Sequence, residues 1–171
     1  MSRADPQNAL MMCFFYASIN AMKIRPAVTM DQAQKDALIA AVKDYLIKQQ
    51  PVLFAYLYGS FAEGRPFHDV DVAAYVDPES FTTTDELFHY GLSLSAELDL
   101  AISGVTVDLR LLNLAPTPFR FSVISKGSLL FTKDETQRID FEGRTRSLYF
   151  DFQPHLRFYQ RNLIFGERTE Q

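Results

Sequence analysis

Apolar positions recur with two different periods along the chain, and they predict alternating helices and strands. From Asp31 to Pro51 they return at spacings of three and four, which predicts an amphipathic helix that Asp31 caps and Pro51 ends. Residues 52–58 form an uninterrupted apolar run of strand-forming side chains, which predicts a buried strand. Residues 69–76 alternate and then turn apolar, which predicts a second strand.

The middle of the chain repeats the same succession. Residues 84–101 have the spacing of a helix, and residues 104–113 alternate strictly between apolar and other side chains. This alternation predicts a third strand whose apolar residues face one way and whose Asp108 and Arg110 face the other.

The last third of the chain begins with two prolines that open a short helix ending at Gly127. Residues 128–132 predict an edge strand, and a long final helix starts near Asp134. Pro154 is expected to kink or break this helix. Helices that alternate with strands in this way predict an α/β or α+β domain.

The first 30 residues differ from the rest. Residues 9–22 form an uncharged, mostly apolar run that is shorter than the about 20 residues needed to span a bilayer. One interpretation is a signal peptide with Arg3 at its basic end. The others are an apolar segment packed on the domain and an extension upstream of a later start methionine. We place the boundary at Met30, with residues 1–29 as an extension and residues 30–171 as the domain.

Composition narrows the class of protein. The 171 residues predict one domain at roughly 150 residues per domain, and 47% apolar with 22% charged residues is typical of a globular chain. Cys13 is the single cysteine, which excludes an internal disulfide and a cysteine metal cage and favours a reducing, cytoplasmic compartment. The net charge of −4 argues against sequence-independent binding to nucleic acid.

Three aspartates are the first candidates for chemistry. Asp69 and Asp71 lie two apart on a predicted strand, so both carboxylates point to the same face. Carboxylate oxygens at this spacing suit Mg²⁺, which binds one or two carboxylates together with substrate phosphates. Asp108 interrupts an apolar strand, where an unpaired charge is costly. It is expected to join the first two aspartates or to pair with Arg110 or Arg65.

Gly59 and Ser60 follow the first predicted strand directly. A glycine there lets the backbone approach a ligand closely, and exposed amides at a helix start attract phosphate. Neither a Gly-Ser pair nor an Asp-x-Asp alone is informative. Their order along the chain, followed by a later strand with an acid, indicates a site for metal-bound triphosphate.

This pattern resembles the nucleotidyltransferase superfamily that includes DNA polymerase beta, and in particular the minimal nucleotidyltransferases, or MNT proteins. Five residues match it in order: Gly59, Ser60, Asp69, Asp71 and Asp108. The resemblance covers about residues 31–165 and implies the nucleotidyltransferase fold, a small mixed β-sheet flanked by helices. One departure is the spacer between Gly-Ser and Asp-x-Asp, which has eight residues, 61–68, where the MNT pattern usually has ten.

The resemblance implies an activity and a partner. MNT proteins are typically antitoxins encoded beside a HEPN-domain ribonuclease toxin, and the implied reaction transfers AMP from ATP to a tyrosine of that toxin. Asp69 and Asp71 would hold two Mg²⁺ ions, and Asp108 would help to bind the catalytic metal and to deprotonate the tyrosine. Gly59 and Ser60 would hold the β- and γ-phosphates.

Other polar residues are weaker candidates. Arg65 lies in the same loop and is a candidate for contact with the triphosphate, whereas His68 is expected to be exposed and Arg110 to pair with Asp108. His89 and His155 are expected to be structural. The final segment mixes basic, acidic and aromatic residues, which is typical of a helix that packs on its own domain or on a partner protein.

Two other functions stay open. An aminoglycoside-type, small-molecule nucleotidyltransferase usually carries an additional substrate domain, for which 171 residues leave little room. A catalytically silent antitoxin would neutralise its toxin by binding alone, and the short spacer favours it. The sequence leaves open whether the protein forms homo- or hetero-oligomers, and it predicts no membrane segment.

Overall fold

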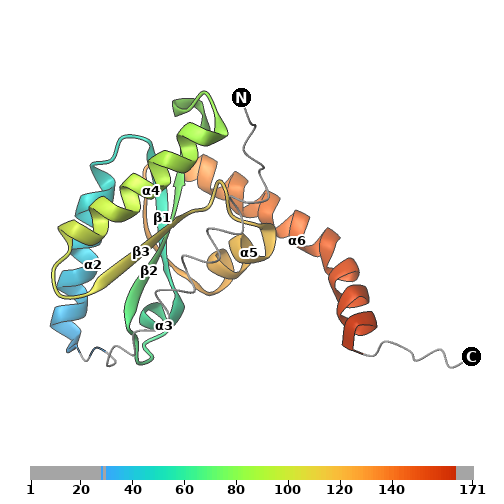
Figure 1. The fold of residues 1–171 in the computed structure, drawn as a ribbon, viewed down its shortest axis with the longest axis horizontal. Helices are drawn as coiled ribbons and strands as arrows, with labels where there is room; N and C mark the ends of the chain where they lie inside the picture. The colour runs from blue at the N-terminus through green and yellow to red at the C-terminus, as the bar shows by residue number, and fades with distance from the viewer. Residues whose placement is uncertain (1–27, 29, 165–171) are drawn as a thin grey trace, which may run out of the picture.

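Four strands form a mixed sheet at the centre of the molecule (Figure 1). The computed structural model describes residues 28 and 30–164. In chain order the strands are β1 (Val52–Tyr58), β2 (Asp69–Val76), β3 (Thr106–Leu111) and β4 (Ser128–Thr132). They lie side by side in the order β3-β2-β1-β4, with β1 antiparallel to both of its neighbours and β2 parallel to β3. The mixed sheet is therefore confirmed.

Helices connect the strands and cover both faces of the sheet. They are α2 (Gln32–Ile47), α3 (Gly59–Ala62), α4 (Thr84–Ala101), α5 (Thr117–Lys126) and α6 (Glu135–Ile164), with a short 3₁₀ turn η1 (Pro78–Ser80) after β2. The predicted cap of α2 is present. Asp31 accepts a hydrogen bond of 2.8 Å from the amide of Gln34, whose side chain accepts one of 2.9 Å from the amide of Asp31.

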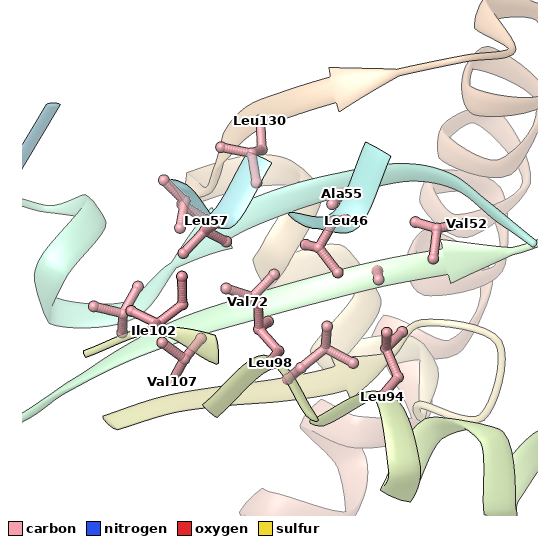
Figure 2. Packing of buried hydrophobic residues seen from close by; sticks show 14 of the residues in the cluster. Leu46, Val52, Ala55, Leu57, Val72, Leu94, Leu98, Ile102, Val107 and Leu130 are labelled. Atoms are coloured by element: carbon pink, nitrogen blue, oxygen red, sulfur yellow. The ribbon is translucent and has the colours of Figure 1, made fainter. Parts of the chain in front are cut away.

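The larger core lies between the sheet and helices α2 and α4 (Figure 2). Apolar side chains of the strands that point to this face meet the buried stripes of the two helices. The fully buried members include Val42, Leu46, Val52, Val70, Val72, Val76 and Leu98. Burying a side chain of this size stabilises the fold by about 1.5–3 kcal/mol, so this face dominates the stability of the domain.

The opposite face of the sheet carries α5 and α6 over a smaller, aromatic core. Phe54 stacks on Tyr75 at 4.8 Å between ring centroids, and Phe141 of α6 packs on both rings. The hydroxyl of Tyr56 donates a 2.6 Å hydrogen bond to Glu142, which anchors α6 to β1. Because side chains alternate along a strand, this is also the face to which Asp69 and Asp71 of β2 belong.

Strand β3 lies at one edge of the sheet, and α4 covers that edge. The outward amides of Val107 and Leu109 donate to the side chains of Asp99 (2.8 Å) and Ser95 (3.2 Å). Edge amides that are paired in this way are not available to another chain. They also fix the backbone on both sides of Asp108.

Most of the expected elements have the predicted bounds, and two differ. The third strand is shorter than predicted at both ends, and at its beginning the reason is Gly104, whose φ of 91° a strand does not use. Of the two outcomes expected at Pro154, the break is wrong, because α6 continues as a helix to Ile164, and the kink stays a prediction. A proline removes one backbone hydrogen bond but leaves those of the neighbouring turns intact.

Most of the predictions for the first 30 residues are not tested by the structure. Residues 9–22 and the interpretations attached to them lie outside the described residues. Val28 forms an isolated β-bridge with Phe67 and packs against the larger core. The boundary at Met30 stays a prediction. No helix in the described part of the chain is long and apolar enough to cross a membrane.

Candidate active site

One row of side chains crosses three strands at the same end of the sheet. Tyr58, the last residue of β1, lies opposite Asp71 of β2, and Asp71 lies beside Asp108 of β3. Asp69 is two residues before Asp71 on the same face, while Val70 and Val72 are buried in the larger core. The predicted arrangement, with three aspartates on one face of neighbouring strands, is therefore confirmed by the register.

Gly59 packs against the central carboxylate of this row. Its φ is 73°, and a Cβ atom at this position would lie 2.1 Å from Oδ2 of Asp71. A side chain at this position would require the carboxylate of Asp71 to move, and the left-handed backbone also disfavours any residue except glycine. The sequence pattern indicated that a glycine here permits a close approach. The structure shows that the group approached is Asp71.

The surroundings of Asp71 make its ionised form less favourable. Its carboxyl is half-buried, and this burial is the main cause that raises its pKa from 3.8 to about 6. The negative charges of Asp69 and Asp108 raise the pKa further, and the positive charge of Arg110 opposes them. Ionisation of Asp71 therefore costs free energy in the folded protein, and a bound cation would reduce this cost.

Asp108 has a cationic partner in the structure. Both Nε and a terminal nitrogen of Arg110 lie 3.3 Å from its Oδ2 atom. The guanidinium of Arg110 also lies 5.8 Å from the centroid of the Phe119 ring. The expected ion pair of Arg110 with Asp108 is confirmed.

The three aspartates share a face without converging on one point. Within the described residues, no group of three or more histidine, cysteine, aspartate or glutamate side chains is placed to hold one metal ion. Asp69 and Asp71 share a face of β2, and Asp108 is engaged by Arg110. The assignment of all three as metal ligands stays a prediction.

The loop after Gly59 holds the other predicted phosphate contacts. Ser60 lies in the four-residue helix α3, and its carbonyl accepts a 2.9 Å hydrogen bond from the amide of Arg65. The guanidinium of Arg65 pairs at 2.5 Å with Glu63, and its side chain is 62% exposed. His68 is exposed, as expected. Phosphate binding by Ser60 and Arg65 stays a prediction.

Tyr58 is a member of the row that the sequence-based assignment left out. Its ring packs edge to face on Phe119 at 5.3 Å, and its hydroxyl oxygen is buried without a hydrogen-bond partner in the described part of the chain. Burial, followed by the charge of Asp71, raises the pKa of the Tyr58 hydroxyl above its ordinary value. Its place in the sequence, directly before Gly59, was the signal that could have indicated its position in the site.

The histidines and the residues of α6 that the sequence singled out lie outside this row of side chains. His89 is exposed and its ring contacts Phe88, and His155 lies among residues whose side chains the structure does not describe. On α6, Arg138 and Arg146 pair with Glu142 beside the body of the domain. Phe150 further along the helix is 55% exposed.

The comparisons with known proteins agree with this geometry. The family described as Polymerase beta, Nucleotidyltransferase matches residues 40–136, which is more than half of the chain and includes every residue of the row. No curated protein sequence matches the chain.

Several solved structures share the fold. One is the structure described as tri-AMPylated Shewanella oneidensis HEPN toxin in complex with MNT antitoxin. The matching chain in it is 21% identical, with a TM-score of 0.52, and the match covers 79% of this chain and 99% of that one. A chain of a toxin–antitoxin structure with AMP-PNP is 20% identical, with a TM-score of 0.54 and 76% and 98% coverage. A further structure from Shewanella oneidensis is 20% identical, with a TM-score of 0.55 and 79% and 99% coverage.

Proposed function

Since this chain belongs to the polymerase beta nucleotidyltransferase family, we propose that it is the antitoxin of a HEPN/MNT pair and transfers AMP from ATP to a tyrosine of its partner toxin. The observation that carries the proposal is the row in which Asp71 lies between Asp69 and Asp108, with the backbone of Gly59 against it. The fold shared with structures of a tri-AMPylated toxin complex and of an AMP-PNP complex supports the partner and the nucleotide.

The donor atoms of the row suit Mg²⁺. Asp69 and Asp71 offer carboxylate oxygens only, which is the ligand type that Mg²⁺ prefers. The raised pKa of Asp71 and the close approach of Gly59 to its carboxylate support a role for this group in binding a cation. Asp108 would become the third metal ligand if its carboxylate left Arg110 and bound the cation instead. When bound, two Mg²⁺ ions would neutralise charge on the triphosphate and at the α-phosphate during transfer.

The residues of this chain have distinct parts in the reaction. The amides and hydroxyl at Gly59 and Ser60 would hold phosphate oxygens, which fixes the α-phosphate in front of the acceptor. The phenolic oxygen of the toxin attacks the α-phosphorus, and the bond between this phosphorus and the bridging oxygen of pyrophosphate breaks. Asp108, once released from Arg110, would accept the phenolic proton. Pyrophosphate carries away the electron pair of the broken bond.

A second function is a silent antitoxin that acts by binding alone. The pairing of Asp108 with Arg110 favours it, because a carboxylate engaged in this way is neither a metal ligand nor a proton acceptor. We prefer the active enzyme because an ion pair between partly exposed groups is worth little, about 1 kcal/mol or less, and a phosphate-bound metal can displace it. The proposed compartment is the cytoplasm, because ATP is available there and because a chain with one cysteine forms no internal disulfide.

The test uses the purified HEPN toxin encoded beside this chain. We expect incubation with Mg²⁺ and ATP to add one or more AMP units to the toxin, measured by intact mass. Asp69→Ala and Asp71→Ala should abolish the adduct, and Asp140→Ala, which removes an exposed acid of α6, should leave it unchanged. An unmodified toxin that is nevertheless neutralised by the wild type would instead support binding alone.

A further inference from the structure

The hydroxyl of Tyr58 lies beside the aspartates but takes no part in the proposed nucleotide transfer. Its oxygen is buried without a partner, and buried polar atoms in native proteins are nearly always hydrogen-bonded. Within the described residues, four residues have a buried side-chain atom in this condition: Tyr58, Tyr90, Arg120 and Thr132. Of these, Tyr58 lies in the row with Asp71 and Asp108.

The position of the Tyr58 ring does not depend on its hydroxyl. The backbone belongs to β1, whose last residue pairs with Asp71 in register. The ring is held edge to face on Phe119 of α5, at 5.3 Å and 89° between ring planes. Strand and helix thus fix where the hydroxyl lies, and no hydrogen bond is needed to keep it there. A donor held ready in this way is the arrangement expected of a group that meets a ligand.

We propose that the hydroxyl of Tyr58 donates a hydrogen bond to an oxygen of the triphosphate of the bound nucleotide. This inference rests on the proposed function. Tyr58 directly precedes Gly59 and Ser60, which would hold the phosphates, and lies opposite Asp71, which would hold the metal. The charged groups around its hydroxyl are the three aspartates and the guanidinium of Arg110. The phenolic O–H would therefore act beside Arg110 as a second donor toward the charged acceptors of the triphosphate. Tyr58 is therefore a substrate-binding residue as well as a part of the fold.

Tyr58→Phe separates this role from a structural one. The substitution keeps the ring and removes only the hydroxyl. If the hydroxyl forms its hydrogen bond only with a bound nucleotide, the ligand-free variant unfolds at the same or a higher temperature than the wild type, because an unpaired buried polar group is lost. Binding of Mg²⁺–ATP weakens about tenfold, because hydrogen bonds to charged groups are strong. A hydroxyl with a structural role gives the opposite pair of results: a lower melting temperature and unchanged binding.

Tyr90→Phe is the matched control. Its hydroxyl is also buried without a partner, but Tyr90 packs beside Phe81 against the core on the other face of the sheet. This variant is expected to bind nucleotide like the wild type. The measurements are calorimetric affinities for Mg²⁺–ATP and for Mg²⁺–tripolyphosphate, together with the melting temperature of each ligand-free protein.

The inference is supported if Tyr58→Phe weakens both ligands by the same factor while the ligand-free variant melts no lower than the wild type. Equal affinities for the variant and the wild type would overturn it. A loss for ATP without a loss for tripolyphosphate would place the hydroxyl on the nucleoside and would also overturn it. If the wild type binds neither ligand, the proposed function fails and the inference fails with it.

Discussion

Replacing Asp71 by asparagine is expected to stabilise the metal-free protein above neutral pH. The carboxyl of Asp71 has a folded-state pKa of about 6 against an ordinary value of 3.8, so the folded protein binds this proton more tightly than the unfolded chain. The wild type therefore loses stability as the pH rises from about 4 to about 6 and carries the full penalty above that range. Asparagine has the same shape and no charge, so the variant avoids the penalty.

The size of the effect follows from the two pKa values. Their difference corresponds to about 3 kcal/mol at 1.36 kcal/mol per pKa unit. Because the carboxyl is only half-buried, solvent screening reduces this to about 1.5 kcal/mol. For a domain of this size such a gain raises the melting temperature by roughly 3–6 °C. Mg²⁺ should reverse the order, because it stabilises the wild type and has lost a ligand in the variant.

The assay is thermal unfolding in EDTA at pH 4.5 and pH 7.5, with Asp140→Asn as a control for removal of an exposed acid. We expect Asp71→Asn to exceed the wild type clearly at pH 7.5, with a much smaller difference at pH 4.5, and the control to change stability by less than about 0.5 kcal/mol at both. A variant that is less stable at pH 7.5, or equally stabilised at both pH values, would refute the electrostatic reasoning.

Three further substitutions test the supports of the site. Gly59→Ala should destabilise the fold by about 2 kcal/mol or more and abolish nucleotide transfer, because the added Cβ collides with a carboxylate oxygen; urea unfolding and the adduct assay measure the two effects. Asp99→Ala leaves a β3 amide unpaired, so we expect a loss of about 1–2 kcal/mol and a lower kcat with a nearly unchanged KM for ATP. Tyr56→Phe removes the hydrogen bond to Glu142 and should cost about 1–2 kcal/mol in urea unfolding while nucleotide affinity stays the same.

The order of the elements and the face of each strand were predictable because they depend on local periodicity. Alternation alone placed Asp69 and Asp71 opposite their buried valine neighbours, and the structure confirms it. The continuity of α6 through Pro154 was not predictable from a rule about single residues, because the turns on either side of a proline can keep the helix intact.

Contacts between residues of different strands could not be predicted from the sequence. That Gly59 approaches the carboxylate of Asp71 depends on the register between β1 and β2, which no local pattern encodes. The sequence favoured a pair of Arg110 with Asp108 but left Arg65 and the other two aspartates open as partners, and the positions of the side chains show the pair with Arg110. Tyr58 was missed for the same reason, since an unpaired buried hydroxyl is a property of its surroundings.

The most direct test of the central claim follows the phosphorus atoms of ATP. The partner toxin is incubated with the wild type, Mg²⁺ and ATP that carries a radioactive label at either the α- or the γ-phosphate. We predict that the α-label appears on the toxin, that the γ-label leaves as pyrophosphate, and that the double variant Asp69→Ala/Asp71→Ala transfers neither. A toxin that acquires the γ-label, or an α-label that persists in the double variant, would contradict nucleotidyl transfer at this row of aspartates.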